Sequence, residues 1–427
     1  VGGVKQGTVK LAIDQDSNQV TTKLYYTTSS NPPVFVDNAA LLQNIPVAPA
    51  KPFYILTKDL DMYNESAGAI FDAWIPIATL TDTFSGVIDG GGYTISNLTF
   101  SGSDKMGLIG RAEDALIYDL YLKDVILNTN TRAGSLVAVA DNTVIHNVHV
   151  TGAVQNSGSY SGGLVGDLTN GSSISKSSFE GMIFHTAGNY IGGLVGRVWD
   201  STVENSYAMA RVYAASSDYV GGLAGYTQLT LSSQVVSNTF SAGDVVGDTN
   251  VGGHTGRIVG AQPNEFAYNF TISNVSGNVG AHTGPIVGFY LDLGSAPLDS
   301  SKSYYSSETT CTNCSGPAIG SSLTLAQFES SGNFTDWDFE DETANGVSDL
   351  WSVPNAGPII LSFMPEPPLS EYCWEGTRFK NAPFANSPDG PTGTPGDEFK
   401  ICTLQQLNAI GSGSNSINWD KAYQLES

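Results

Sequence analysis

The sequence predicts an all-β protein, a parallel β-helix (β-solenoid) of about 28–30 residues per coil. Three observations carry this prediction: a short glycine-flanked apolar phrase recurs, its copies are almost evenly spaced, and the composition is that of strands and tight turns. Only 14% of the 427 residues are charged, and 48 are Gly. Small polar and β-branched residues fit a pleated surface and its turns, so this composition favours strands.

The recurring phrase is Gly-Gly-Leu-Val-Gly or a close variant. Its apolar residue returns after 28, 28, 30, 29, 35 and 28 residues. A period of this size is typical of repeats that cannot bury their own apolar faces and must stack on their neighbours. The apolar residues, expected to stack as an interior ladder, are Leu108, Leu136, Leu164, Leu194, Leu223, Ile258 and Ile286.

Each repeat has room for three short strands and three turns, which is one coil of a β-helix. A propeller blade needs four strands and ~40–45 residues, so the period argues against a propeller. Each coil is expected to rise by ~4.8 Å, the distance between neighbouring strands. The glycines would let the backbone turn corners or pack closely.

The chain divides into four predicted segments. An alternating N-terminal β-strand segment comes first, followed by the solenoid with its caps, a linker rich in Pro and Gly, and a C-terminal segment. Trp337 and Trp351 are expected in a closing cap, because an open solenoid end exposes backbone and core. The predicted boundaries are 1–37, 38–364, 365–399 and 400–427.

The C-terminal segment repeats the start of the solenoid. Phe399–Ile410 and Tyr423–Leu425 parallel Asn38–Ile45 and Tyr54–Leu56. Either the chain is part of a longer array of solenoids, or its ends complete a neighbouring subunit in a head-to-tail filament. We favour the filament, because both ends of the chain resemble unpaired strand donors. The candidate assembly residues are Val9, Leu11, Ile13, Leu24, Tyr26, Ile401, Leu404, Leu407, Ile410, Trp419, Tyr423 and Leu425.

Charge excludes some partners. The 41 acidic and 18 basic residues give a net charge of −23, which repels phosphate backbones and anionic lipid, so we expect neither nucleic acid nor membrane insertion. No apolar stretch has the length of a transmembrane helix. The chain begins with Val1 rather than Met, as a processed protein or a piece would, and a removed signal peptide fits the composition.

These phrases resemble the GLUG-motif repeats of bacterial surface and secreted proteins, including large adhesins and repeat regions of IgA-specific peptidases. The resemblance covers about residues 38–364 and rests on the glycine phrases, on Phe84–Leu98, on Trp74–Ile77 and on the closing Trp337–Phe339 and Trp351. It implies a right-handed β-helix on the outside of a bacterium. In such proteins these repeats usually serve as stalk or scaffold.

Two histidines and four cysteines are the candidate metal or redox residues. His254 and His282 occur in similar phrases 28 residues apart, but no third ligand recurs with them, so a surface ladder is favoured over a zinc site. Cys311 and Cys314 form a C-x-x-C in a Ser/Thr-rich loop. A redox motif or a zinc site with Cys373 and Cys402 is an alternative, but outside a cell the default is two disulfide staples, 311–314 and 373–402.

Acidic and basic residues give no catalytic constellation. Carboxylates cluster at Asp59 and Asp61 and again at 336–342, where calcium is an option, although neither cluster has a known calcium-loop spacing. A polysaccharide lyase or hydrolase would need carboxylates, or carboxylates with Arg or Lys, converging on one face. The arginines of the array fall at different phases of the repeat and predict no such convergence; they are Arg111, Arg132, Arg197, Arg211 and Arg257.

The sequence therefore favours a non-catalytic structural protein of the bacterial exterior without a cofactor, either an adhesin stalk or a subunit of an extracellular filament. Its expected contacts are other solenoid units and a glycan, host or abiotic surface. The alternatives are a polysaccharide-active β-helix enzyme and a carbohydrate-binding module.

Overall fold

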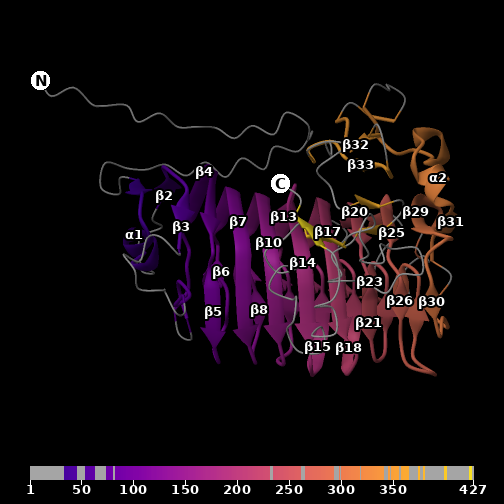
Figure 1. Cartoon of the computed structure of the whole chain (residues 1–427), viewed down its shortest axis with the longest axis horizontal. Helices are drawn as coiled ribbons and strands as arrows, with labels where there is room; N and C mark the ends of the chain where they lie inside the picture. The colour runs from indigo at the N-terminus through magenta and orange to yellow at the C-terminus, as the bar shows by residue number, and fades with distance from the viewer. Residues whose placement is uncertain are drawn as a thin grey trace, which may run out of the picture.

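The computed structural model is a β-solenoid whose coils stack along one long axis, as the sequence predicts (Figure 1). Strands of successive coils pair in parallel throughout the solenoid. The right-handed sense stays a prediction. The described residues are 33–45, 53–62, 74–79, 82–230, 234–260, 265–292, 298, 300–317, 319–340, 345–346, 348–354 and 357–364, with four short strands beyond them.

Each central coil passes through three parallel sheets in turn, which we call the long, six-stranded and seven-stranded sheets. The long sheet contains β1 (Val34–Val36), β2 (Phe53–Leu56), β3 (Leu60–Asp61), β4 (Val87–Ser96), β5 (Thr99–Gly102), β7 (Leu116–Thr129), β10 (Val144–Asn156), β13 (Ser173–Ser175), β14 (Ser178–His185), β17 (Thr202–Ala214), β20 (Val236–Ala242), β21 (Val245–Gly247), β24 (Phe266–Ala267), β25 (Asn269–Ile272), β26 (Val275–Ser276), β29 (Ser303–Ser306), β30 (Cys311–Thr312) and β31 (Ser321–Leu323). The six-stranded sheet contains β8 (Ala133–Gly134), β11 (Ser161–Gly162), β15 (Gly188–Gly192), β18 (Ser217–Gly221), β22 (Val251–Gly252) and β27 (Thr283–Gly284). The seven-stranded sheet contains β6 (Ile109–Glu113), β9 (Val137–Asp141), β12 (Val165–Thr169), β16 (Val195–Trp199), β19 (Ala224–Gln228), β23 (Thr255–Val259) and β28 (Val287–Leu291).

The interior ladder forms at the predicted leucines. Leu164, Leu194 and Leu223 are fully buried. The Leu164 amide donates to the Leu194 carbonyl at 2.9 Å, and the Leu194 amide donates to the Leu223 carbonyl at 2.8 Å. Backbone pairing between coils therefore holds each leucine over the next, and burial of the stack supplies the hydrophobic stabilisation of the rod.

One rung of this ladder differs from the prediction. Ala224 pairs with Thr255, and Thr255 pairs with Val287. The fully buried side chain that follows Leu223 in the ladder is therefore His254, and Ile258 lies farther along β23. The prediction was wrong here because two coils are longer than the others, so the phrase that looks most like the repeat is not the one in register.

The two glycines before Leu164 are needed for close approach of the backbone. A Cβ on Gly162 would lie 2.1 Å from the Val165 carbonyl oxygen, and one on Gly163 would lie 2.3 Å from the Gly193 carbonyl oxygen. Contacts this short exclude every side chain. The repeated glycine pair thus sets how tightly the corner between the six-stranded and seven-stranded sheets turns.

The N-terminal end is capped by α1 (Ala39–Gln43), which follows β1. The Asn38 side chain accepts a hydrogen bond from the Leu41 amide at 2.9 Å, a standard N-cap. Ala39 and Leu42 are buried against the solenoid core. β1 pairs with β2, so it forms the first strand of the long sheet from within the segment predicted as 1–37.

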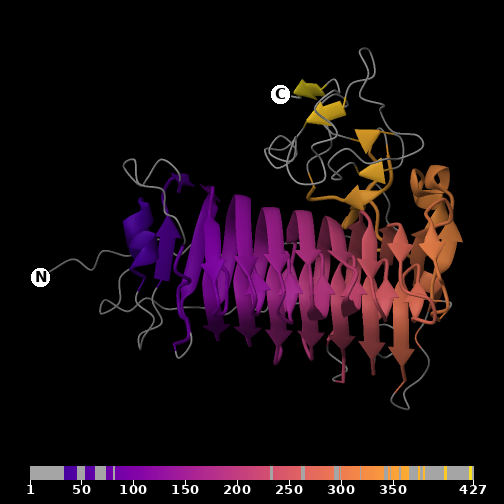
Figure 2. The same cartoon turned by 60° about the horizontal axis from the view of Figure 1, so that its bottom comes forward.

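The Trp-containing closing segment covers a side of the rod, which differs from the predicted closure of an open end (Figure 2). We call the described residues between Leu325 and Met364 the lateral cap. Its core is formed by outward-facing aromatics of the long sheet together with its own Trp337 and Trp351. Its elements are α2 (Leu325–Phe328), η2 (Ser331–Asn333) and the antiparallel pair β32 (Trp351–Ser352) and β33 (Ile360–Leu361), and η1 (Ser300–Lys302) precedes β29.

Beyond the lateral cap, four short strands are described. β34 (Trp374–Glu375) and β35 (Arg378–Phe379) pair antiparallel. β36 (Phe399–Ile401) and β37 (Tyr423–Leu425) pair in parallel, with Phe399 opposite Tyr423 and Ile401 opposite Leu425. The β1–β2 pair has the same form, with Val34 opposite Tyr54 and Val36 opposite Leu56.

Candidate functional site

The two histidines that the sequence groups together lie in different environments. His254 is fully buried in the interior ladder. His282 lies at an exposed corner, with its ring 4.7 Å from that of Phe289. The prediction of a shared surface ladder was therefore wrong, because the similar phrases around the two histidines occupy different positions in their coils.

His254 belongs to a polar network inside the solenoid. Its Nε2 lies 2.9 Å from Thr239 Oγ1, and its Nδ1 lies 3.0 Å from Thr255 Oγ1. Thr239 in turn donates to Asn269 Oδ1 at 2.7 Å. Burial lowers the pKa of His254 to about 3, because a charged imidazole would lose its hydration in the interior. His254 is therefore neutral at pH 7.

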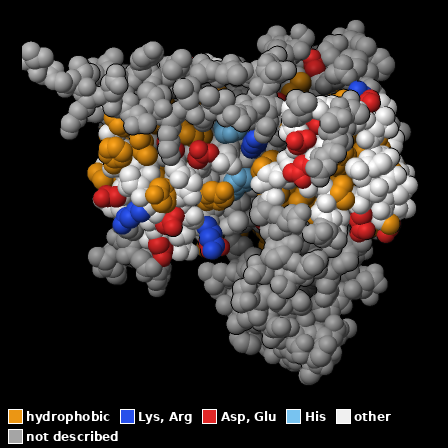
Figure 3. Space-filling view, turned by 90° about the horizontal axis from the view of Figure 1, so that it is seen from above, with side chains coloured by type: hydrophobic (Ala, Val, Ile, Leu, Met, Phe, Trp, Pro, Cys, Tyr) orange, Lys and Arg blue, Asp and Glu red, His pale blue; other side chains and the backbone are white. Residues whose placement is uncertain are grey.

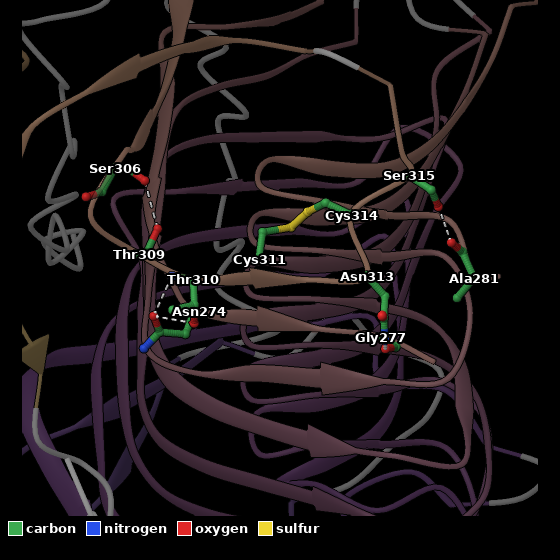
Figure 4. The surroundings of a disulfide bond; sticks show 10 residues. All are labelled: Asn274, Gly277, Ala281, Ser306, Thr309, Thr310, Cys311, Asn313, Cys314 and Ser315. Carbon is green, nitrogen blue, oxygen red and sulfur yellow. Dashed lines mark hydrogen bonds between the residues drawn. A yellow bond between two sulfur atoms is a disulfide. The ribbon is translucent and has the colours of Figure 1, made fainter. Parts of the chain in front are cut away.

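Cys311 and Cys314 are joined by a disulfide in the last coil (Figure 4). The loop that holds them is tied to the preceding coil. Asn313 Nδ2 donates to the Gly277 carbonyl at 2.7 Å, and the Thr310 amide donates to Asn274 Oδ1 at 2.9 Å. Cys373 and Cys402 lie outside the described residues, so the predicted 373–402 bridge stays a prediction.

The predicted acidic clusters make hydrogen bonds and ion pairs. Asp59 accepts from the Thr94 amide at 2.8 Å, and Asp61 accepts from Asn97 Nδ2 at 2.7 Å. Asp338 accepts from the Ser348 amide at 3.1 Å. Within the described part of the chain, no group of three or more His, Cys, Asp or Glu residues is arranged to hold a metal ion.

The sequence predicted no convergence of the array's arginines with carboxylates, but Arg132 and Arg197 both lie beside Asp167. These two arginines and Arg257 also pack against one ladder of tyrosines. Tyr160 immediately precedes β11, and Tyr190 and Tyr219 occupy the equivalent positions within β15 and β18. Their rings stack at centroid distances of 4.8 and 5.1 Å. We call this surface the tyrosine–arginine face; its residues are Tyr160, Tyr190, Tyr219, Tyr226, Arg132, Arg197 and Arg257.

The guanidinium groups pack against the rings of this ladder. Arg132 lies 4.4 Å and Arg197 4.7 Å from the centroid of Tyr160. Arg257 lies 5.5 Å from the centroid of Tyr219, and its Nη1 donates to the Tyr219 hydroxyl at 3.3 Å. Such cation–π contacts hold the arginines in place, while the side chain of Arg132 is 39% exposed and that of Arg197 is 16% exposed.

Only one carboxylate pairs with these three arginines among the described residues. Asp167 accepts from Arg197 Nε at 2.8 Å and Nη2 at 2.9 Å, and it lies 3.7 Å from Arg132. Its side chain is 2% exposed, whereas that of Arg132 is 39% exposed. Arg257 makes no ion pair within the described part of the chain. The face therefore presents net positive charge on a protein whose net charge is −23.

The tyrosine backbones adopt a left-handed conformation. Their φ angles are 66° at Tyr160, 68° at Tyr190 and 58° at Tyr219. Asn250, with φ of 53°, occupies the same corner one coil later. Asn tolerates this region well, whereas bulky residues there are strained. Backbone conformation alone therefore does not explain why tyrosine occupies this corner in three successive coils.

Burial raises the pKa of Tyr190 and of Tyr226, and the nearby Arg197 and Arg257 partly oppose this effect. These hydroxyls stay protonated at neutral pH and can both donate and accept hydrogen bonds. Together with the guanidinium edges, they form a row of polar groups that can bind a ligand. They offer no general base or nucleophile for chemistry at neutral pH.

The sequence does carry a signal for this face. Each ladder tyrosine stands two residues before a glycine pair, in Tyr160–Gly163, Tyr190–Gly193 and Tyr219–Gly222. The repeated tyrosine predicts stacked rings once the period is known. The arginines come from two different positions of the coil, so their approach to the rings depends on how the corner folds.

A second aromatic ladder runs along the outer face of the long sheet. Tyr207, Phe240, Phe270 and Tyr304 pair in register across four coils. Tyr207 and Phe240 stack at 5.0 Å, and Phe240 and Phe270 at 4.8 Å. The lateral cap covers this ladder, and Phe270 is fully buried.

Titratable groups gather where the lateral cap ends. The ring centroid of Phe363 lies 6.0 Å from that of His149 and 6.3 Å from that of Tyr207. Glu180 accepts a hydrogen bond from the Tyr207 hydroxyl at 2.8 Å, and burial raises the pKa of its carboxyl. Burial, with a smaller contribution from His146, lowers the pKa of His149 to about 4. Figure 3 looks onto this side of the rod, where histidine and hydrophobic side chains lie close together.

His149 also stands in a chain of hydrogen bonds. Its Nδ1 lies 2.9 Å from Ser178 Oγ, and its Nε2 lies 3.1 Å from Asn147 Oδ1. Asn147 donates to Asp119 at 2.7 Å. This order of hydroxyl, imidazole, amide and carboxylate resembles a nucleophile relay, but the Ser178 side chain is 1% exposed and out of reach of a bulky substrate.

Most predicted assembly residues lie outside the described residues. Ile401 lies in β36, and Tyr423 and Leu425 lie in β37, where the pairing of the strands is described. At the N-terminal end, Val34 is 41% and Phe35 59% exposed on β1, the first strand of the long sheet.

Comparison with known proteins supports the repeat assignment. Residues 187–213 match the family Glug, described as the GLUG motif. The chain is 32% identical over 191 residues to halomucin of Haloquadratum walsbyi, a match that covers 41% of this chain and 2% of halomucin. It is 35% identical over 82 residues to a proposed Gly-rich membrane protein of Evansella cellulosilytica, covering 19% of this chain and 10% of that protein. The chain thus spans a small fraction of the length of these relatives.

Two solved structures match this chain at low sequence identity. One is a crystal structure from Bacteroides ovatus proposed to be an immunoglobulin A1 protease, with 17% identity, a TM-score of 0.48 and coverage of 79% of this chain and 94% of that chain. The other is an IgA1 protease, with 19% identity, a TM-score of 0.41 and coverage of 64% and 21%. Among the described residues, no helix is long and apolar enough to span a membrane.

Proposed function

We propose that this chain is a structural unit of a protein on the outside of the cell, in which the solenoid serves as a rigid spacer in an adhesin stalk. The names of its two relatives, halomucin and a Gly-rich membrane protein, support a place at the cell surface. The continuous interior ladder supports the spacer role, because each coil is held to the next by backbone hydrogen bonds and buried apolar contacts.

The observation that carries this proposal is the recurrence of the solenoid's opening strand pair. β36 pairs with β37 as β1 pairs with β2, in parallel and over three residues. Thr403, two residues after β36, corresponds to Asn38, the N-cap residue two residues after β1. This recurrence supports a second solenoid unit that begins at β36, and tandem units of this kind would build a stalk.

Sedimentation of the full chain and of residues 1–398 separates the stalk from the head-to-tail filament. For a stalk, both chains sediment as elongated monomers with similar frictional ratios. Polymerisation of the full chain that is lost on truncation would overturn the stalk and establish the filament. Circular dichroism of both chains, dominated by β-structure, controls for folding.

One observation favours a second candidate, a polysaccharide-active enzyme. Burial raises the pKa of Glu180, which accepts a hydrogen bond from the Tyr207 hydroxyl beside the end of the lateral cap, and a carboxyl with a raised pKa serves as the general acid of glycoside hydrolysis. The test is incubation of the purified chain with acidic and neutral polysaccharides. Depolymerisation that is abolished in Glu180→Gln would replace the structural proposal, whereas unchanged polymer length supports it.

A further inference from the structure

We propose that the tyrosine–arginine face binds an extended anionic polysaccharide, one carrying carboxylate or sulfate groups, aligned with the axis of the solenoid. This inference does not rest on the structural role proposed above. A spacer without ligand and a spacer with a glycan-binding side are both compatible with the fold.

The geometry of the face matches a linear polymer. Arg132, Tyr160, Tyr190 and Tyr219 occupy one corner in successive coils, and Arg257 follows in the next coil. Coils rise by ~4.8 Å, so the face extends over about 19 Å along the axis. A polymer lying along the rod meets a tyrosine hydroxyl or a guanidinium group at every coil, and contacts that repeat in this way add up along the chain.

The charge of the face indicates an anionic polymer. Arg257 lies over Tyr219 and Phe289, at 5.5 and 5.1 Å from their ring centroids, with no carboxylate paired to it in the described part of the chain. Arg132 is only partly neutralised by Asp167, at 3.7 Å. A guanidinium group binds carboxylate or sulfate oxygens through its planar fork of N–H donors, and the rings beneath reduce the loss of side-chain entropy on binding.

The backbone strain indicates selection for the tyrosine side chain. Asn250 shows that the corner accepts Asn, which is better suited to positive φ. The tyrosine rings lie on the outside, where their stacking contributes little to the hydrophobic core. Retaining tyrosine in three successive coils is therefore best explained by what the hydroxyls and the arginines they hold contact outside the protein.

The test measures binding of the full chain to polygalacturonate and to dextran sulfate by calorimetry, with neutral dextran as the comparison polymer. We expect both anionic polymers to bind, more weakly as salt is raised, because exposed charges are screened. Arg257→Gln is expected to raise Kd about tenfold, and Tyr190→Asn by a similar factor, as expected for loss of one charge-assisted contact in each case.

Arg211→Gln is the matched control, because it removes the same charge from β17 on the long sheet. It should leave Kd unchanged, and thermal melting should show that all three variants fold. Binding of neither anionic polymer, equal binding of neutral dextran, or an equal loss in Arg211→Gln would overturn the proposal. Self-association of the full chain that Arg257→Gln abolishes would assign the face to a contact between copies instead.

Discussion

The two aromatic ladders of this solenoid are both built from rings that stack in successive coils, but one is covered by the lateral cap and the other is partly exposed. On the long sheet, Tyr207, Phe240 and Phe270 stack with normal strand geometry and are covered by the lateral cap. At the corner formed by the six-stranded sheet, Tyr160, Tyr190 and Tyr219 stack at similar distances, carry positive φ and remain partly exposed.

The difference shows that the stacking of aromatic rings follows from the repeat. Whether a ladder contributes to stability or to binding depends on whether another segment of the chain covers it. A covered ladder contributes buried area and joins the cap to the rod. A partly exposed ladder with strained backbones contributes little to stability, and its retention is explained by binding. The predictions below test this division by comparing matched residues in the two ladders.

The largest expected effect is at Trp337, which lies in the core of the lateral cap. Its ring is 4.6 Å from Trp351 and 5.8 Å from Tyr304, and it is 1% exposed. Trp337→Ala should lower the free energy of unfolding by about 3–5 kcal/mol, as expected for deleting a buried aromatic ring. Denaturant unfolding followed by near-UV circular dichroism measures the loss.

Trp199→Ala is the matched control, since Trp199 is 36% exposed beside Arg197 near the tyrosine–arginine face. Trp199→Ala should lower the free energy of unfolding by less than about 1 kcal/mol, the usual limit for a surface cation–π contact. Equal losses for the two variants would contradict the division between a stabilising and a binding ladder.

The next effect concerns the interior ladder, where His254 replaces leucine. Its folded pKa of about 3 lies below the ordinary value of 6.5, so the unfolded chain binds the proton more readily. Stability is therefore retained above pH 6.5 and falls as the pH drops toward 3, by about 1.4 kcal/mol per unit. Unfolding at pH 6.5 and pH 4.5 should then differ by up to about 3 kcal/mol from this residue.

His254→Leu restores the apolar rung and should remove this part of the acid sensitivity. The remaining dependence comes from other groups, including His149 and His185, whose pKa values burial lowers to about 4. Identical pH profiles of the wild type and His254→Leu would show that His254 does not take up the proton on unfolding.

The fold was predictable because the period and the buried leucines repeat together. The register of one coil was not, because the phrase around Ile258 resembles the repeat more closely than the phrase around His254. A leucine position occupied by histidine breaks the apolar pattern on which sequence alignment of repeats depends. Only the strand pairing, Ala224 with Thr255, reveals it.

The lateral cap and the tyrosine–arginine face were predictable in part. In β17, the small Ala208 and Ala210 face inward and the large Tyr207 and Met209 face outward, all buried. A strand that is apolar on both faces indicates cover on both sides. What supplies the cover, and which arginines approach the tyrosines, depends on contacts between distant segments that no local pattern encodes.

Substitution with Asn compares the two ladders directly. Tyr190→Asn should change the free energy of unfolding by less than about 1 kcal/mol, because relief of left-handed strain offsets the lost stacking. Phe240→Asn, at a position 3% exposed under the lateral cap, should destabilise by more than about 3 kcal/mol through lost burial and an unsatisfied amide. Chemical denaturation of both variants checks this, and a large loss for Tyr190→Asn would mean that the exposed ladder is structural.

The smallest expected effect is on tyrosine ionisation in the exposed ladder. Burial raises the pKa of Tyr226, and Arg257 is the main opposing group. Because the folded state favours the protonated hydroxyl, this stabilisation is present below pH of about 10 and is lost as the pH rises above it. Tyr226→Phe should remove one late-ionising group from the ultraviolet titration, and Arg257→Gln should shift that group to still higher pH. A shift to lower pH in Arg257→Gln would show that the guanidinium does not act on this hydroxyl, and the packing of Arg257 against the ladder would then need another explanation.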